Sequence, residues 1–228
     1  MHPRLSNKIL RPDFQGEFTA SILAAAASPE LISFAGGLPN PVSFPVEEMD
    51  KAAHKVLEHN GVMALQYSGT QGYQPLREWV AKRYETMGVS GVQADDIIIT
   101  NGSQQVLTMM GACMLDPGDK VIVFSPFYEN YGADAILSGA DPIFVPLVPP
   151  TFDFDRNVLE DAFRQHPKAI IVCNPSNPCG KVFTKDELLF IGGLCNRYDA
   201  YMITDEVYEH IVFAPYHHVY AGSLPEIA

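Results

Sequence analysis

The chain has 228 residues, of which 47% are hydrophobic and 18% charged, and its formal net charge is -12. This composition is typical of a folded globular protein with room for one large α/β domain, or for one and part of a second. The acidic residues are dispersed and leave no basic surface for phosphate backbones, so we expect no nucleic-acid partner.

The first part of the chain predicts a loop followed by two helices. Residues 34–41 are rich in glycine and proline, which favours a loop. Pro45 opens a helix that we expect to end at Gly61. A second helix is expected to begin near Pro75, with one apolar face formed by Leu76, Trp79, Val80, Tyr84 and Met87.

From residue 96 onward, β-branched apolar runs alternate with helical patterns. The expected strands are 97–100, 120–124, 142–145, 169–173 and 201–204. The expected helices are 103–115, 128–137, 158–165 and 184–197, the last opened by a capping box of Thr184 and Glu187. Continuous apolar strands that are each followed by a helix predict an α/β fold, with a mostly parallel sheet and helices on both faces.

The cysteines and the N-terminal residues bear on metal binding and on the cellular compartment of the protein. The cysteines show no Cys-x-x-Cys pair and no histidine at zinc-ligand spacing, so we expect no metal site. Cys113, Cys173 and Cys195 lie in apolar contexts, which favours buried thiols. Residues 1–5 lack an apolar signal core, and residues 21–27 are too short an apolar run to cross a membrane. We therefore expect a cytoplasmic protein without membrane contact.

Polar residues follow several of the predicted strands at the point where each strand ends, namely Asn101, Ser125, Asn174 and Asp205. The carboxyl ends of parallel strands meet at one edge of a sheet, where ligands of such folds bind. Asn101 to Gln105 joins a strand to a helix, so its free N–H groups suit an anion, although a plain helix cap is the alternative.

The next two segments carry an aromatic ring and a rigid turn. In residues 125–131, Tyr128 is equally consistent with stacking on a planar ligand and with packing, whereas Phe127 favours packing. Residues 174–180 contain two Asn-Pro steps and a glycine. Their asparagine amides either donate to a ligand oxygen or cap the turn.

Asp205 is the strongest single candidate, because a carboxylate at a strand end can pair with a pyridine nitrogen. Tyr208 could then donate to the phenolic oxygen of the same ring. The alternative for Asp205 is a cap of the following turn, while Glu206 and Glu209 are expected to be solvated.

These segments, in this order and spacing, resemble the class I/II aminotransferases of fold type I, which use pyridoxal phosphate (PLP). The resemblance implies the large domain of that fold, incomplete at its C-terminal end, over residues 45–228. Residues 1–44 would be an N-terminal segment of the small domain with the substrate loop. The implied reaction is transamination between an amino acid and a 2-oxo acid in a homodimer.

The resemblance also assigns roles to individual residues. Gly102, Ser103 and Gln104 would hold the cofactor phosphate, and Tyr128 would stack on the ring. Asn177 and Tyr208 would bind the phenolic oxygen, and Asp205 the ring nitrogen. Tyr67 resembles the tyrosine that reaches the phosphate in the partner subunit, and Gly37 the glycine whose backbone meets the substrate carboxylate.

The family places its Schiff-base lysine downstream of this aspartate, but no lysine follows Asp205 in this chain. The sequence therefore offers no catalytic residue of its own. Lys168, Lys181 and Lys185, the nearest upstream, are expected to be solvated. Two alternatives stay open, a non-catalytic fragment or pseudoenzyme and a PLP-dependent β-lyase or related synthase.

Overall fold

The computed structural model describes residues 20–22, 24–25, 31–32, 34 and 37–227. These residues fall into two compact units, one within residues 10–70 and the other within residues 71–228. The predicted boundary between residues 44 and 45 stays a prediction.

The first unit contains a short 3-10 helix, η1 (Pro41–Ser43), and the long helix α2 (Val46–Ala64). The helix begins where Pro45 predicted, with Glu47 and Glu48 in its first turn, where the helix dipole favours acidic residues. The helix breaks at Asn60, whose φ of -135° and ψ of 19° are not helical, directly before the predicted end at Gly61. A further helical turn then continues to Ala64.

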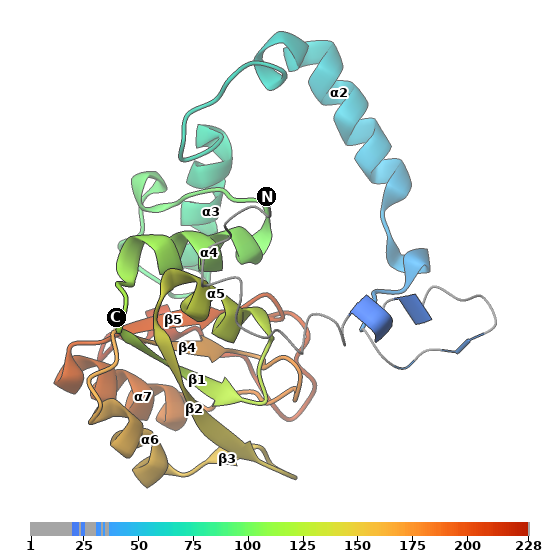
Figure 1. Ribbon diagram of the computed structural model, residues 1–228. Coiled ribbons are helices and arrows are strands. Elements are labelled where there is room, and N and C mark those ends of the chain that lie inside the picture. Colours follow the sequence, from blue (N-terminus) through green and yellow to red (C-terminus); the bar gives the residue numbers. More distant parts are fainter. Residues whose placement is uncertain (1–19, 23, 26–30, 33, 35–36, 228) are drawn as a thin grey trace, which may run out of the picture. The chain divides into compact units, whose positions relative to one another are not determined.

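The second unit is built on a sheet with the strand order β3-β2-β1-β4-β5 (Figure 1). Its strands are β1 (Lys120–Ser125), β2 (Asp141–Val148), β3 (Asp153–Phe154), β4 (Ala169–Cys173) and β5 (Tyr201–Asp205). All neighbouring strands are parallel except the short β3, which pairs antiparallel with β2. The predicted mostly parallel sheet is confirmed.

Helices cover both faces of this sheet, as Figure 1 shows. On one face α6 (Arg156–Phe163) and α7 (Lys185–Tyr198) pack on alternate strand residues such as Ile122 and Val172. On the other face α4 (Gly102–Met114) and α5 (Asn130–Ser138) pack on their neighbours, such as Val123 and Ile171. Because successive strand residues face opposite sides, a continuous apolar strand serves both cores.

The first turns of two helices agree with the sequence predictions. The second predicted helix is α3 (Gln74–Thr86), which carries Pro75 in its first turn. The predicted capping box opens α7, since Thr184 accepts a bond from the Glu187 N–H and the Glu187 carboxylate accepts one from the Thr184 N–H.

Two predictions about strands were wrong. Residues 97–100 are extended but form no ladder with any described strand. Their one backbone hydrogen bond to a distant segment of the chain runs from the Ile99 N–H to the Gln71 carbonyl. An apolar run becomes a strand only when a neighbour pairs with it. Conversely, β3 was not predicted, because two residues are too few to carry a periodic signal.

The described cysteines are all free thiols, but they differ in burial. Cys173 and Cys195 are buried as predicted, whereas Cys113 is exposed because α4 packs on the sheet through the opposite face, with Leu107 and Gly111. No described helix is long and apolar enough to cross a membrane. In the described part of the chain, no group of three or more histidine, cysteine or acidic side chains is placed to hold a metal ion.

Candidate functional site

The carboxyl ends of the parallel strands gather the predicted site residues of the second unit at one edge of the sheet. Ser125, Cys173 and Asp205 end β1, β4 and β5, three neighbouring strands. A cavity of about 380 Å³ opens at this edge, and both Ser103 of α4 and Asp205 line it. Two segments that are about a hundred residues apart in the sequence therefore contribute to one hollow.

The first turn of α4 presents backbone N–H groups rather than a capped end. The Asn101 side chain makes no capping bond to the described helix, so the predicted alternative of a simple Asn101 cap is not what the structure shows. Gly102 has a φ of +70°, in the left-handed region that favours glycine. Ser103 is exposed beside it. The positive end of the helix dipole and these N–H groups suit an anion.

The side chain of Gln104 points toward α5 rather than toward open solvent. Its amide nitrogen donates to Asp134 Oδ2 at 2.8 Å, and its amide oxygen accepts from Asn130 Nδ2. Asp134 is buried and also accepts from the Thr108 hydroxyl at 3.0 Å. The Gln104 side chain is thus tied to α5, and its backbone N–H at the start of the helix is the group better suited to an anion. Sequence reasoning missed Asp134, because no pattern links it to Gln104.

Tyr128 precedes α5 and lies within the same polar network. Its hydroxyl accepts a hydrogen bond from Asn130 Nδ2 at 2.7 Å, and its ring meets Tyr131 edge to face, with 5.5 Å between centroids. Burial raises the pKa of Tyr128, and the nearby Tyr208 phenol adds to this effect. Phe127 stacks on Phe144, in the packing role that the sequence favoured.

The two asparagines of the Asn-Pro turn behave differently. Asn174 is fully buried, accepts from the Phe183 N–H at 3.0 Å and donates to the Val219 carbonyl at 3.3 Å. It therefore fixes the turn, and its full burial keeps its amide away from a ligand. Asn177 is half-buried, and only its backbone N–H is engaged, with Cys173 Sγ, among the described residues.

Both oxygens of the Asp205 carboxylate have partners. Oδ2 accepts a hydrogen bond from the Tyr131 hydroxyl at 2.7 Å, and Oδ1 accepts one from the Val207 N–H at 3.3 Å. The second bond caps the turn after β5, so the capping alternative is observed in part. Tyr131 was missed, because nothing in the sequence links a helix residue to a carboxylate 74 positions later.

Glu206 and Glu209 were expected to be solvated, and this was wrong. Their side chains are only 19% and 16% exposed, because α3 and the segment around residue 218 cover them. Burial raises the pKa of Glu206 to about 7, with smaller contributions from Glu209 and Asp205. Glu209 forms an ion pair with Arg83, and Glu206 Oε1 lies 3.7 Å from His218 Nε2. The Arg83–Glu209 ion pair thus lines the same cavity as Asp205.

The lysines do not face this site. Lys168 and Lys185 are exposed as predicted, but Lys181 is buried, which corrects the expectation of a solvated side chain. Its ammonium lies 2.9 Å from Asp153 and 2.8 Å from Glu187. Sequence reasoning missed this cluster because Asp153 lies on the unpredicted β3.

Two predicted site residues belong to the other unit. Gly37, with a φ of +57°, and the exposed Tyr67 both lie within residues 10–70. Their roles stay predictions.

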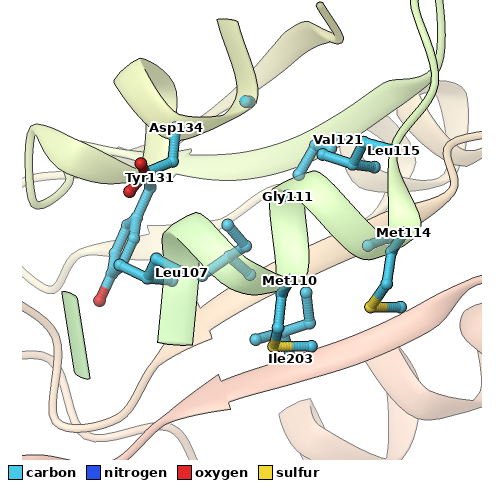
Figure 2. Close-up of a pocket in the computed structure, with 12 residues that line it drawn as sticks. Leu107, Met110, Gly111, Met114, Leu115, Val121, Tyr131, Asp134 and Ile203 are labelled. Atoms are coloured by element: carbon cyan, nitrogen blue, oxygen red, sulfur yellow. The ribbon is translucent and has the colours of Figure 1, made fainter. Parts of the chain in front are cut away.

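A second, smaller cavity lies on the α4 and α5 face of the sheet (Figure 2). It measures about 30 Å³, and apolar residues such as Leu107 and Met110 form most of its wall. Figure 2 shows the Tyr131 ring beside Leu107, with its hydroxyl directed away from Asp134. A space of this size holds about one water molecule, so it is a gap in packing and no ligand site.

Comparisons with known proteins show the family of this chain. The sequence profile of the family "Aminotransferase class I and II" matches residues 35–224. The chain is 30% identical to human kynurenine–oxoglutarate transaminase 1 over 214 residues, which is 88% of this chain and 50% of that protein. It is 36% identical to 2-aminoadipate transaminase of Thermus thermophilus over 168 residues, which is 73% of this chain and 40% of that protein.

The fold is also found in solved structures. A protein from Escherichia coli with a methionine aminotransferase function superposes with a TM-score of 0.86 at 26% identity, covering 100% of this chain and 57% of that one. The chain spans about half the length of the relatives it matches. Its sheet is that of the large domain of fold-type I aminotransferases, present in part. The chain belongs to the class I and II aminotransferase family.

Proposed function

We propose that this chain is the cofactor-binding portion of a PLP-dependent aminotransferase, which moves an amino group from an amino acid to a 2-oxo acid. The observation that carries the proposal is the shared cavity of Ser103 and Asp205, since it brings a helix end that suits an anion and a carboxylate to one hollow. PLP is the cofactor of the family and carries a phosphate at one end of a pyridine ring and a nitrogen at the other.

The residues present fit such a cofactor. The N–H groups of Ser103 and Gln104 would bind the phosphate, because the first turn of α4 has no side-chain cap. The N–H of Gly102 donates to the Thr100 carbonyl at 3.0 Å, so it would have to exchange this bond for one to the phosphate. Each oxygen of Asp205 accepts one hydrogen bond and so keeps a lone pair free, which the protonated ring nitrogen can use.

The bound cofactor supplies an electron-withdrawing ring that stabilises negative charge at the substrate α-carbon. Asp205 would hold a proton on the ring nitrogen and thereby maintain this pull. Tyr128 would stack on the ring, and the amide of Asn177 and the phenol of Tyr208 would donate to its phenolic oxygen. The turn that Asn174 fixes keeps Asn177 at the end of β4.

Other parts of the reaction depend on residues elsewhere in the protein. No lysine stands between residues 186 and 228, and Lys181 is held by two carboxylates, so in this proposal a lysine beyond the given sequence would supply the amine. The backbone at Gly37 would meet the substrate carboxylate. Tyr67 would reach the phosphate bound to the partner subunit of a homodimer. Residues 1–44 would then belong to the small domain and residues 45–228 to the large one.

The absent lysine also favours a second candidate, a chain that binds PLP without catalysis. The relatives named above act on different amino acids by name, so the donor is proposed only as an amino acid. A β-lyase or related synthase with the same cofactor site remains the third candidate.

Trp79 provides a direct test of cofactor binding. It is the chain's only tryptophan and lines the cavity with Asp205, so PLP should quench its fluorescence. Asp205→Asn should weaken binding about tenfold, because it removes a charge-assisted hydrogen bond. Pyridoxal without its phosphate should also bind more weakly. A chain whose fluorescence does not respond to PLP would contradict the proposal.

The reaction itself is tested with the full-length protein. Incubation with single amino acids and no acceptor should yield one equivalent of a 2-oxo acid per site. Continuous release of pyruvate and ammonia would identify a lyase instead. Binding of PLP without either product would establish the non-catalytic candidate.

A further inference from the structure

Tyr131 lies deep in the core, yet its hydroxyl reaches the candidate site. The side chain is 2% exposed and packs with Leu107 and Val123 on the α4 and α5 face of the sheet. The distance of 2.7 Å from its hydroxyl to Asp205 Oδ2 is typical of a strong O–H···O⁻ bond. Burial raises the pKa of Tyr131, so the phenol keeps its proton and donates.

The surroundings of this bond leave the carboxylate charge without a cation. Among the described residues Asp205 takes part in no ion pair, and its other oxygen meets only the Val207 N–H. The Tyr131 hydroxyl also lies close to the Cys173 thiol, whose pKa burial raises and which is therefore neutral. The phenol is thus the one side chain in the described region that hydrogen-bonds Asp205.

Such a donor has two effects on a carboxylate. It fixes the plane of the carboxylate, and it stabilises the ionised form over the protonated form. A proton shared between Asp205 and a ring nitrogen would then reside on the nitrogen. The Tyr131 ring is buried among apolar residues and meets the Tyr128 ring edge to face, so the core sets its orientation.

We propose that Tyr131 is a positioning residue for Asp205, whose hydroxyl orients the carboxylate toward the ring nitrogen of the cofactor and keeps that nitrogen protonated. The inference rests on the proposed function, because it concerns the same site. It adds a residue that touches neither substrate nor cofactor and acts through Asp205.

The test compares PLP with its 1-deaza analogue, in which a CH group replaces the ring nitrogen, on the 228-residue chain. Trp79 fluorescence gives both dissociation constants. Asp205 contributes to binding of PLP but finds no partner in the analogue, so the wild-type chain should prefer PLP. Tyr131→Phe should reduce this preference about tenfold, with most of the loss on PLP.

The matched control is Tyr198→Phe, which also removes one phenolic hydroxyl. Tyr198 packs on Phe163 on the opposite face of the sheet from Tyr131, so this variant should leave the preference unchanged. A folding defect weakens both ligands together and does not change their ratio, so a purely structural role for Tyr131 predicts an unchanged preference.

The outcomes separate the two proposals. A wild-type chain that binds PLP, with a preference that Tyr131→Phe leaves intact, overturns the role of Tyr131 while the proposed function stands. A wild-type chain that binds neither compound overturns both. The ¹⁵N chemical shift of the pyridine nitrogen in labelled PLP reports on its protonation directly. This shift should move toward the value of an unprotonated pyridine nitrogen in Tyr131→Phe but not in Tyr198→Phe.

Discussion

Lys181 and Glu187 form a buried ion pair whose carboxylate also closes the first turn of α7. The ammonium lies 2.8 Å from Glu187 Oε1, while Oε2 accepts from the Thr184 N–H at 2.8 Å. The same ammonium lies 2.9 Å from Asp153 on β3. One side chain therefore joins the end of the Asn-Pro turn, the edge strand and a helix cap.

Replacement of Lys181 should destabilise the protein more than replacement of the exposed Lys185. Lys181→Met leaves the largely buried Glu187 carboxylate without its counter-charge, at a cost of about 3 kcal/mol. Lys185→Met, at an exposed position in the first turn of α7, should change the free energy of unfolding by less than about 0.5 kcal/mol. Urea unfolding of the two variants measures the difference. Equal midpoints would show that the buried pair contributes no stability.

Glu206 should make the stability of the protein depend on pH. The folded protein holds the pKa of Glu206 at about 7, whereas the unfolded chain ionises near the ordinary value of 4.5. Between these values the folded state binds the extra proton, so the free energy of unfolding falls as the pH rises through the window. Glu206→Gln removes this dependence.

The variant should therefore match the wild type near pH 4.5 and exceed it above pH 7, by up to about 3 kcal/mol. Denaturant unfolding at both ends of the window gives the two differences. If the variant is equally stabilised or destabilised at both, Glu206 does not titrate in this range.

Two glycines should respond to alanine in opposite directions. Gly102 has a φ of +70° with nothing within 4 Å of an added Cβ, so the cost of Gly102→Ala is conformational, about 1 kcal/mol. Gly193 lies inside α7, where an added Cβ also meets nothing. Gly193→Ala should therefore stabilise the protein by about 0.5 to 1 kcal/mol. Thermal unfolding measures both, and a neutral Gly102→Ala would mean that the left-handed turn is not required.

The fold could be predicted from the sequence where one segment carries its own signal. The apolar runs 169–173 and 201–204 stand between helix patterns, and they form β4 and β5 almost to the residue. Residues 97–100 carry an equally strong run but have no ladder partner among the described strands. Local preference is present in both cases, and only the neighbour in space differs.

The candidate site was predictable in its strand ends but not in its supporting contacts. Asp205 follows a strand, so its position follows from the parallel order alone. The partners that fix it, Tyr131 and the Val207 N–H, depend on how α5 packs and how the next turn folds. Glu206 was misjudged for the same reason, because its burial is produced by segments that lie far away in the sequence.

The sheet ends at β5, which pairs with β4 along one side only in the described structure. The Tyr201 N–H bonds to the Lys168 carbonyl, and the Asp205 carbonyl accepts from the Asn174 N–H, so the odd-numbered residues of β5 face β4. The amides of Met202 and Thr204 then point to the open side. Hydrogen exchange should divide this one strand into slow and fast amides in alternation. A polypeptide that pairs with the open side of β5 would slow hydrogen exchange at the amides of Met202 and Thr204 alone. Exchange at these two amides therefore reports on such pairing.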